Sequence, residues 1–418
     1  MSDGASAGID QRERGFLRLE WAREHMPVMA KVRESFQRER PFRGMKVAMA
    51  LHVEAKTGIL ALLFREGGAD VRLASCNPLS TDDSVVASLK EDFGLSVYAR
   101  RGETNEEYYD YLNRVLDIGP DIVVDDGGDL VRLLHTERKD IDTVIGGNEE
   151  TTTGVVRLRA MEKNGVLRFP MFDVNDAMMK HFFDNRYGTG QSTLDGIMNA
   201  TNLVIAGKDV VVAGYGFCGK GIAMRMRGMG ASVTVTEIDP VKAVEAIMDG
   251  FRVERMSQAL RHADIVVTAT GMKNVVRYDD LLQAKPGLIL ANSGHFNNEI
   301  EVDVLVSRSM ERRRVRDHVD MFRLENGNRV YLISEGRLVN LAAGQGHPAE
   351  IMDMSFAIQA LTARYLAENH HRLERRVYPV PREIDMEVAR LKLESMGVEI
   401  DRLDSEQERY AESWEEGT

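Results

Sequence analysis

The stretch of residues 209–240 constrains the fold of this chain more than any other part of the sequence. It opens with an apolar run, 210–213, continues through the spacing Gly214-x-Gly216-x-x-Gly219, and then reads as a helix followed by a second β-rich run. In a dinucleotide-binding βαβ unit the first glycine makes a tight turn, the second lets the backbone approach the pyrophosphate, and the third lets helix and strand pack closely. The sequence therefore predicts a dinucleotide-binding α/β domain.

The acidic residue that ends the second β-rich run indicates which dinucleotide is bound. Glu237 follows Thr236 directly, and an acidic side chain here accepts hydrogen bonds from the adenosine ribose and repels the 2′-phosphate of NADP. The N-terminus of the intervening helix offers free N–H groups to the pyrophosphate. We therefore predict NAD rather than NADP. A glycine-rich turn in an unrelated sheet protein is the alternative.

The composition excludes several classes of function. With 418 residues the chain can form two or three domains, and its net charge of −12 argues against binding to nucleic acid. The arginine-rich run 311–316 is expected to be an exposed face of a helix or loop. Cys76 and Cys218 lie far apart and form no disulfide framework, which favours a cytoplasmic location. No CxxC or HExxH spacing occurs, so we expect no metal site.

No segment of the sequence reads as a membrane span or a targeting signal. No apolar run approaches the roughly 20 residues that cross a bilayer. Residues 1–15 lack the apolar region of a secretory signal. We therefore expect a protein that does not associate with membranes.

Strands and helices alternate ahead of the glycine motif. We predict strands at 45–51, 70–75, 96–99, 121–124, 141–145 and 166–172, with helices between most of them. This pattern predicts a parallel, doubly wound sheet, so the fold class is α/β with two such Rossmann-like domains. The charged section 311–329 is assigned no strand, and 349–367 is predicted to be one amphipathic helix.

Polar clusters fall at the carboxyl ends of these predicted strands. They are His52, the acidic run 125–129, the run 148–153 and the pair 175–176. Each cluster alone is typical of a helix cap or an Asx turn. Ligands of open α/β sheets bind at this edge, so four clusters together predict a polar ligand.

Several of these motifs resemble the signatures of the S-adenosylhomocysteine hydrolase family. They are Asp-Asp-Gly-Gly-Asp (125–129), Glu-Glu-Thr-Thr-Thr-Gly (149–154), Val-Asn-Asp (174–176), Phe-Asp-Asn-x-Tyr-Gly (183–188), Val-Ala-Gly-Tyr-Gly-x-x-Gly-Lys-Gly (212–221), Thr-Glu-Ile-Asp-Pro (236–240), Gly-His-Phe (294–296), Glu-Gly-Arg-Leu-Val-Asn-Leu (335–341) and Gly-His-Pro (346–348). The resemblance runs from about residue 15 to the end of the chain. It implies hydrolysis of the thioether of a nucleosyl homocysteine, with resident NAD that is regenerated in each cycle.

The resemblance also implies a domain plan. Residues 1–185 and 347–385 would form a discontinuous substrate-binding domain, 186–346 the inserted NAD-binding domain, and 386–418 a C-terminal helical dimerisation segment, usually within a homotetramer. The last residues, Glu-Glu-Gly-Thr, differ from the longer tail of the family. We therefore expect NAD to be held more weakly or by other contacts.

By the same resemblance, each polar cluster acquires a role. Lys180 would be the base at the ribose 3′-oxygen, provided that burial or the nicotinamide charge neutralises its amine. Asp184 would hold Lys180 or a ribose hydroxyl, and Asn185 would position the catalytic groups and the nicotinamide. The remaining implied catalytic residues are Glu150 for the ribose hydroxyls, and Asp126 with His52 for proton transfer at the 4′/5′ end. The implied cofactor contacts are Thr151, Thr152, Thr153, Asn185, Gly214, Gly216, Phe217, Cys218, Gly219, Glu237, Thr270, Asn292 and Asn340. The implied substrate-side residues are Glu54, Lys56, Thr57, His295 and His347.

One motif departs from the family. The adenosyl-specific pattern is His-x-Thr-x-Glu, whereas this chain has His52-x-Glu54-x-Lys56. If the segment is extended, all three side chains point to one side and face the purine. Lysine donates and carboxylate accepts, which matches O6 and N1–H of hypoxanthine. The pattern is similar to that of the branch that acts on S-inosylhomocysteine, as in methanogens. A second departure is Thr189, which stands where the family has a cysteine beside the nicotinamide.

Three alternatives stay open at this point. Lys56 could merely neutralise Glu54, so that S-adenosylhomocysteine is the main substrate. The glycine motif with a late histidine also fits a 2-hydroxyacid NAD dehydrogenase. A non-catalytic NAD-binding regulator is the third alternative, although Lys180, Asp184, Asp126 and Glu150 are all present.

Overall fold

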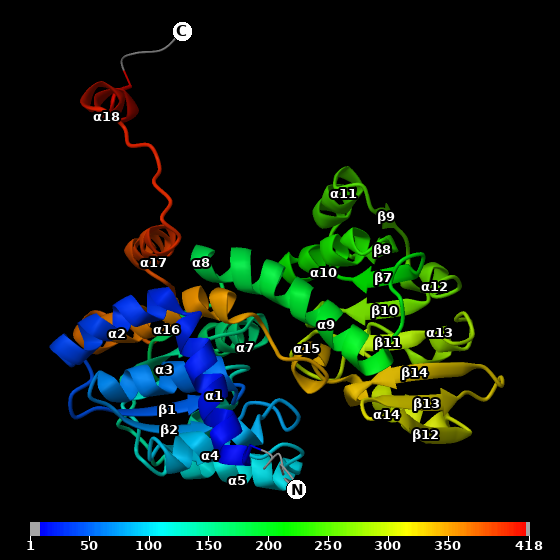
Figure 1. Cartoon of the computed structure of the whole chain (residues 1–418), viewed down its shortest axis with the longest axis horizontal. Helices are drawn as coiled ribbons and strands as arrows, with labels where there is room; N and C mark the ends of the chain where they lie inside the picture. The colour runs from blue at the N-terminus through cyan, green and yellow to red at the C-terminus, as the bar shows by residue number, and fades with distance from the viewer. Residues whose placement is uncertain (1–8, 415–418) are drawn as a thin grey trace, which may run out of the picture.

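The computed structural model describes residues 9–414, which form two α/β lobes joined by two crossings of the chain (Figure 1). Each lobe is built on its own sheet, with seven strands in the first and eight in the second. The predicted α/β class with two Rossmann-like domains is therefore confirmed.

The first sheet is parallel throughout, in the order β15-β6-β5-β4-β1-β2-β3. Its strands are β1 (Lys46–Ala50), β2 (Asp70–Ala74), β3 (Ser96–Tyr98), β4 (Ile122–Asp125), β5 (Gly146–Glu149), β6 (Met171–Asp173) and β15 (Val377–Pro379). The helices packed around it are α1 (Gln11–Glu24), α2 (Pro27–Glu39), α3 (Ala55–Glu66), α4 (Asp83–Glu91), α5 (Asn105–Leu116), α6 (Asp129–His135), α7 (Thr152–Lys163), α16 (Ala349–Asn369) and α17 (Arg382–Ser395). Because β15 follows the whole second sheet in sequence, this lobe is discontinuous.

The predicted strand at 141–145 is wrong, because the strand β5 begins only at Gly146. Glycine has a low β-propensity, so β-propensity placed the predicted strand in the residues before Gly146. A Cβ at Gly147 would overlap Val123 of β4, and one at Gly146 would come within 2.7 Å of Leu366 on α16. Close packing against α16 at Gly146 and against the neighbouring strand β4 at Gly147 therefore selects the glycines for this strand.

The second sheet has the order β12-β13-β14-β11-β10-β7-β8-β9. Its strands are β7 (Asp209–Ala213), β8 (Ser232–Thr236), β9 (Arg252–Val253), β10 (Ile265–Thr268), β11 (Ile289–Asn292), β12 (Glu311–Arg316), β13 (Val319–Arg323) and β14 (Arg329–Ile333). Its longer helices are α9 (Thr189–Thr201), α10 (Phe217–Gly228), α11 (Pro240–Met248) and α14 (Val302–Arg308). β13 pairs antiparallel with both β12 and β14, and the other strand pairs of this sheet are parallel.

Within the charged section 311–329, β12 and β13 form a β-hairpin, so the expected helix or loop at 311–316 is wrong, although the expected exposure of 311–316 is confirmed. Arg312 and Arg314 on β12 both pair with Asp320, a buried carboxylate on β13. On β13 itself, Val319, Met321 and Phe322 are buried. The arginines thus neutralise an internal charge on an edge strand, where charged side chains also discourage pairing with other chains.

One continuous helical segment carries the chain from the first lobe to the second. It consists of α8 (Met178–Lys180), a π-helix (His181–Gly188) and α9. π-helical turns are rare and occur often at functional sites. Asp385 on α17 accepts hydrogen bonds from Met178 N at 2.9 Å and Met179 N at 2.8 Å, which caps the start of this segment.

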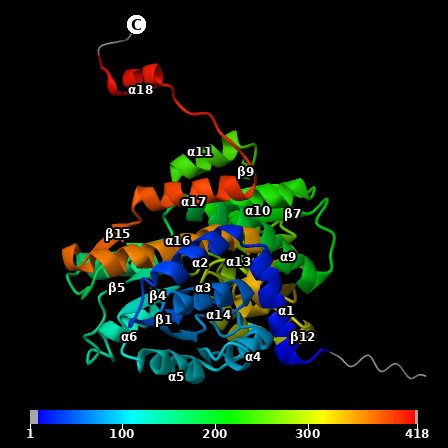
Figure 2. The same ribbon diagram turned by 60° about the vertical axis from the view of Figure 1, so that its left-hand side comes forward.

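The C-terminal part of the described chain leaves the first lobe. After α17 an extended stretch leads to α18 (Ser405–Glu412), which projects away from both lobes in two views (Figures 1 and 2). Residues 1–8 and 415–418, including the final Glu-Glu-Gly-Thr, lie outside the described residues. Among the helices of residues 9–414, none is both long and apolar enough to cross a membrane.

Candidate functional site

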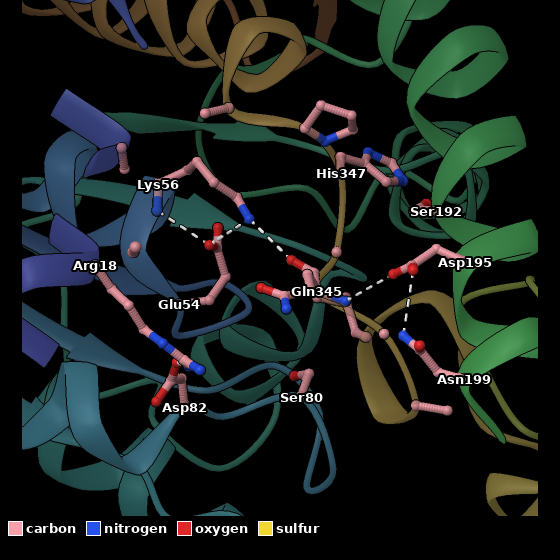
Figure 3. Close-up of a pocket in the computed structure, with 18 of the residues that line it drawn as sticks. Arg18, Glu54, Lys56, Ser80, Asp82, Ser192, Asp195, Asn199, Gln345 and His347 are labelled. Atoms are coloured by element: carbon pink, nitrogen blue, oxygen red, sulfur yellow. Dashed lines mark hydrogen bonds and ion pairs between the residues drawn. The ribbon is translucent and has the colours of Figure 1, made fainter. Parts of the chain in front are cut away.

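A small cavity of 130 Å³ lies between the two lobes, at the carboxyl ends of the first sheet. All eleven side chains that the sequence predicted for catalysis and substrate binding line it: His52, Glu54, Lys56, Thr57, Asp126, Glu150, Lys180, Asp184, Asn185, His295 and His347. Glu54, Lys56 and His347 also border a wider hollow of 1370 Å³ between α1 and α9 (Figure 3). The structure therefore brings the predicted clusters into one site.

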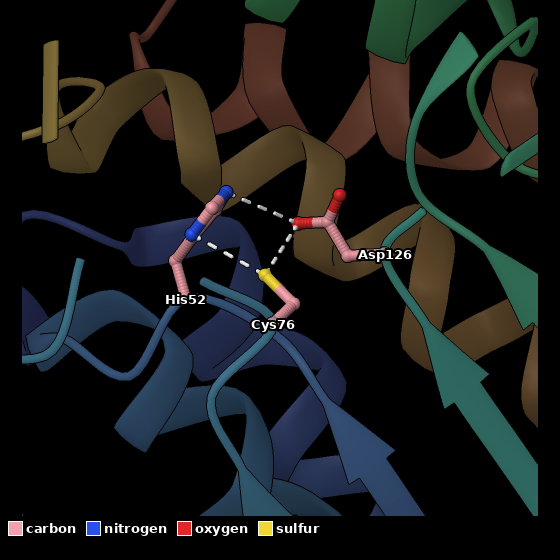
Figure 4. Close-up of side chains that lie close together, drawn as sticks. All are labelled: His52, Cys76 and Asp126. Carbon is pink, nitrogen blue, oxygen red and sulfur yellow. Dashed lines mark hydrogen bonds and ion pairs between the residues drawn. The ribbon is translucent and has the colours of Figure 1, made fainter. Parts of the chain in front are cut away.

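One end of the cavity holds a cluster of His52, Cys76 and Asp126 (Figure 4). Cys76 Sγ lies 3.3 Å from His52 Nδ1 and 3.5 Å from Asp126 Oδ2, and His52 Nε2 lies 3.5 Å from the same oxygen. Ser80 Oγ lies 2.7 Å from His52 Nδ1. Burial lowers the pKa of His52 to about 4, despite the opposing effect of Asp126. This imidazole is therefore neutral near pH 7, and it can accept a proton.

The donor atoms of this cluster all lie within 4.8 Å of one another, a spacing at which they could also hold a metal ion. The three residues follow three different strands, so no motif spacing in the sequence could reveal the set. On the other side of Asp126, His295 Nδ1 lies 3.5 Å from Oδ1. Asp126 thus stands between two histidines, one from each lobe.

Lys180 is the centre of the polar network in the middle of the cavity. Its Nζ donates to Asn185 Oδ1 at 2.8 Å and to Asn175 Oδ1 at 3.4 Å, and it lies 3.5 Å from Glu150 Oε1 and 3.8 Å from Asp184 Oδ2. Burial alone would lower the pKa of Lys180, but Asp184 and Glu150 raise it well above its ordinary value. Burial therefore does not by itself neutralise this amine, because Asp184 and Glu150 oppose desolvation, and neutralisation by the nicotinamide charge stays a prediction.

Asp184 links the two crossings of the chain. Its Oδ1 lies 2.8 Å from His347 Nδ1, and Ser355 Oγ on α16 donates to its Oδ2 at 2.8 Å. Burial alone would raise the pKa of Asp184, but Lys180 and His347 hold it well below its usual range. Asp184 is therefore an anion that orients both Lys180 and His347.

Glu150 faces the same lysine from the end of β5. Gln359 Nε2 on α16 donates to its Oε2 at 2.5 Å. Burial raises the pKa of Glu150 to about 8, against the effect of Lys180. Glu150 and Asp184 thus flank one lysine, but their pKa values shift in opposite directions, because Asp184 also pairs with His347 and Ser355.

Glu54 and Lys56 lie at the start of a helix and not in an extended segment. β1 ends at Ala50, and the Glu54 carboxylate caps α3 by accepting from Lys56 N at 3.0 Å and Thr57 N at 3.3 Å. Capping by an acidic side chain stabilises this turn and overrides the extended geometry that we expected. Lys56 Nζ lies 2.6 Å from Glu54 Oε2 and donates to the carbonyl oxygen of Gln345 at 3.1 Å (Figure 3).

A separate cavity of 860 Å³ runs along the carboxyl edge of the second sheet. The predicted cofactor residues that line it are Thr151, Thr152, Thr153, Asn185, Gly214, Gly216, Phe217, Cys218, Glu237 and Thr270. It shares Thr151, Thr152, Asn185, Cys218, Ser293 and His295 with the smaller cavity. A ligand in one cavity would therefore meet a ligand in the other.

The three glycines of the motif have the geometry that a dinucleotide requires. Gly214 has φ of +94°, which favours glycine, and a Cβ at Gly219 would overlap the Gly214 carbonyl oxygen. A Cβ at Gly216, in contrast, would meet nothing within 4 Å. The packing of the chain itself therefore does not require a glycine at 216. The space beside Gly216, at the N-terminus of α10, is open to a phosphate.

Three predicted cofactor residues do not line this cavity: Gly219, Asn292 and Asn340. Asn292 is fully buried, and it donates to three carbonyl oxygens and accepts from Thr268 Oγ1 and Gly294 N. Its side chain therefore shapes the loop that carries His295. Asn340 lines the smaller cavity, and its buried Oδ1 has no hydrogen-bond partner. That acceptor fits the amide of a nicotinamide ring.

Sequence reasoning missed several polar residues that complete the site. They are Cys76, Ser80, Glu299, Ser355 and Gln359. Ser355 and Gln359 are one helical turn apart on α16, a buried helix that returns from the end of the chain. Their i,i+4 spacing was visible, but nothing in the sequence indicated which strands that helix would cover.

Comparison with known proteins agrees with this geometry. The family model described as S-adenosyl-L-homocysteine hydrolase, NAD binding domain, matches residues 185–346, and the model described as S-adenosyl-L-homocysteine hydrolase matches residues 5–145. An adenosylhomocysteinase of Thermoplasma acidophilum is 68% identical over 406 residues, which cover 97% of this chain and 99% of the relative. An S-inosyl-L-homocysteine hydrolase of Methanocaldococcus jannaschii is 56% identical over 411 residues, 98% of this chain and 99% of the relative.

These similarities extend over both lobes and decide two of the three alternatives that the sequence left open. They give no support to a 2-hydroxyacid dehydrogenase or a non-catalytic regulator. They support NAD as the cofactor and hydrolysis as the reaction. The chain belongs to the S-adenosyl-L-homocysteine hydrolase family and is an NAD-dependent hydrolase.

Proposed function

We propose that this enzyme cleaves S-nucleosyl-L-homocysteine into a nucleoside and L-homocysteine, with S-inosyl-L-homocysteine as the preferred substrate. The observation that carries the purine preference is the hydrogen bonding of Lys56. An ammonium group has three N–H donors, and two are directed at Glu54 Oε2 and the Gln345 carbonyl oxygen. The third is free for a ligand, and O6 of hypoxanthine is an acceptor.

Glu54 contributes less to this preference than the sequence suggested. Its two carboxylate oxygens receive Lys56 N, Lys56 Nζ, Thr57 N and Thr57 Oγ1. Little acceptor capacity remains for a purine N–H group. The Lys56 ammonium therefore distinguishes the two purines. The 6-amino group of adenine would place its N–H donors against the N–H donors of Lys56, and an unpaired buried polar group costs about 1–3 kcal/mol.

The alternative substrate is S-adenosyl-L-homocysteine, because Lys56 could instead donate to N1 of adenine. The named relatives support both substrates, since the relative at 68% identity is an adenosylhomocysteinase and the one at 56% is an S-inosyl-L-homocysteine hydrolase. The decisive measurement is homocysteine release from the two substrates side by side. We expect kcat/KM to favour the inosyl substrate by about 10-fold, which corresponds to about 1.4 kcal/mol.

A double variant tests the role of the motif. Glu54→Thr with Lys56→Glu restores the His-x-Thr-x-Glu pattern and is expected to reverse the preference toward the adenosyl substrate. Lys285→Met is the matched control, because this lysine also forms an ion pair, with Asp264 at 2.7 Å, but lies outside both cavities. A wild-type enzyme that strongly favours the adenosyl substrate would contradict the proposed preference.

We propose the following roles for the residues of the smaller cavity. Bound NAD would supply reversible oxidation of the ribose 3′-hydroxyl, which acidifies the neighbouring 4′ C–H bond. Lys180 would bind the 3′-oxygen and exchange its proton, while Glu150 binds the ribose hydroxyls and Asn185 holds the Lys180 ammonium in place. The geometry supports an anionic Asp184 that keeps Lys180 and His347 oriented.

Proton transfer at the 4′/5′ end would fall to Asp126 and His52. The neutral state of His52 supports a proton-accepting role, and His295 faces Asp126 from the other lobe. His295 and His347 would close over the homocysteine side of the substrate. Glu237 and the glycine motif would hold the adenosine half of NAD, since they line the larger cofactor cavity.

We also propose that the enzyme is a cytoplasmic homotetramer whose residues 386–418 join two copies. Within the described part of this segment, Ile400, Leu403 and Tyr410 are largely exposed, and α18 projects away from both lobes (Figure 2). Exposed apolar side chains on a projecting segment are typical of an intersubunit contact. Truncation after residue 396 is expected to lower the molar mass measured by light scattering; an unchanged mass would contradict this assembly.

A further inference from the structure

Two adjacent strands of the first sheet end in paired acidic residues. Asp125 of β4 is in register with Glu149 of β5, and both side chains are 0% exposed. The residues that follow them, Asp126 and Glu150, line the cavity between the lobes. The second acid of each pair therefore faces the substrate, and the first is enclosed by protein.

Glu149 connects the two loops that leave these strands. Its Oε1 accepts a hydrogen bond from Gly127 N at 2.8 Å and another from Thr151 N at 3.0 Å. Gly127 directly follows Asp126, and Thr151 directly follows Glu150 and lines both cavities. A single oxygen atom thus fixes the substrate-side loop relative to the cofactor-side loop.

The surrounding chain makes room for this carboxyl group. A Cβ at Gly154, in the first turn of α7, would overlap the Glu149 carboxyl group. Gly127 and Gly128 have φ of +105° and +78°, conformations that side chains strongly disfavour. The loop after Asp126 therefore has little stiffness of its own, and it depends on outside contacts for its position.

The second contact to the same loop comes from Arg157 on α7, which donates to the Gly127 carbonyl oxygen at 2.5 Å and to Asp129 Oδ1 at 2.9 Å. The Glu149 Oε2 atom, in contrast, is buried without a hydrogen-bond partner. Burial, together with Asp125 and Asp126, raises the pKa of Glu149 well above its ordinary value. A neutral acid fits this environment, because an ionised carboxylate would leave a buried charge unpaired.

We propose that Glu149 is a positioning residue whose Oε1 bridges Gly127 and Thr151, and so sets Asp126 in place relative to Glu150 and the cofactor cavity. It acts as a neutral acid and touches no reacting atom. The kinetic part of this inference rests on the proposed function; the structural part, the bridge between two backbone N–H groups, does not.

Three variants separate the bridge from simple packing. Glu149→Gln keeps one acceptor oxygen at neutral charge, and it is expected to keep kcat within about 3-fold of wild type and to leave the pH profile unchanged. Glu149→Ala removes the acceptor, and displacement of Asp126 by about 1 Å is expected to lower kcat about 100-fold. The double variant Glu149→Ala with Gly154→Ala fills the vacated space with a methyl group, so it restores thermal stability without restoring kcat.

Hydrogen exchange of the Gly127 and Thr151 amides, measured on the folded enzyme, gives a readout that is independent of turnover. Protection is expected to persist in Glu149→Gln and to be lost in both variants that carry Glu149→Ala. The inference is overturned if Glu149→Gln is as impaired as Glu149→Ala, if the double variant recovers kcat, or if both amides stay protected without the acceptor. Should wild type release homocysteine from neither nucleoside, the proposed function fails, but the exchange experiment still decides the bridge.

Discussion

Asp385 offers a direct test of how the end of the chain holds the centre of the site in place. This residue is on α17, and its carboxylate accepts from the backbone N–H groups of Met178 and Met179 at 2.9 and 2.8 Å. These two residues begin the short helix that ends with Lys180. We predict that Asp385→Ala loosens this helix start and displaces Lys180 from Asn185, while the rest of the site stays in place.

The magnitude follows from the two lost hydrogen bonds. Replacing an acidic helix cap by alanine costs about 0.5–2 kcal/mol, and the near-complete burial of Asp385 places the loss toward the upper end. A loss of about 2 kcal/mol lowers the melting temperature by roughly 4–8 °C for a lobe of this size. Misplacement of Lys180 by a fraction of an ångström is expected to lower kcat by about 10-fold.

The chain offers a matched control in Asp353. On α16 this buried carboxylate caps α2 in the same way, accepting from Val28 N at 3.2 Å and Met29 N at 2.8 Å. Asp353→Ala is expected to lower the melting temperature at least as much, yet to leave kcat of the folded enzyme within about 2-fold. Calorimetry and homocysteine release on both variants make the comparison, and an equal effect on kcat would refute the reasoning.

Three further predictions concern single positions. Gly216→Ala should leave the melting temperature of the NAD-free protein unchanged but weaken NAD binding about 10-fold, as measured by titration calorimetry. Gly219→Ala should lower both the melting temperature and the NAD affinity, because a Cβ at Gly219, unlike one at Gly216, overlaps other atoms. Burial raises the pKa of Glu103 to about 7, so the folded protein binds this proton more tightly than the unfolded chain and loses stability as the pH rises through 7. Glu103→Gln should therefore melt at a higher temperature than wild type at pH 8 but not at pH 5, and an equal shift at both would contradict it. Gln359→Leu removes the donor to Glu150, and chemical denaturation should show a loss of about 1–3 kcal/mol.

The features that depend on local sequence could be predicted. The βαβ unit at 209–240 has its glycines, helix and Glu237 within one continuous segment, so their order in the sequence is their order in space. The polar clusters after β1, β4 and β5 were also predictable, since parallel strands place their carboxyl ends at one edge. Resemblance then supplied roles that spacing alone left open.

Features that depend on distant segments could not be predicted. β5 begins at Gly146, where α16, two hundred residues later, leaves no room for a side chain, and no local propensity signals that contact. The predicted extended geometry at Lys56 was wrong for a different reason. The Glu54 side chain, which was expected to face the purine, caps α3 instead. The charge of Lys180 depends on two carboxylates that only the folded chain brings within 4 Å.

The discontinuous first sheet has a consequence for synthesis on the ribosome. The second sheet has all its strands once β14 has been made, whereas the first lacks its edge strand until β15 emerges and lacks the cap on α8 until Asp385 emerges. The cofactor lobe can therefore complete its sheet while the half-built substrate lobe is still waiting for its last strand. The first half of the chain spends most of translation as an incomplete sheet with β6 as an open edge, which a chaperone or a second nascent chain could reach.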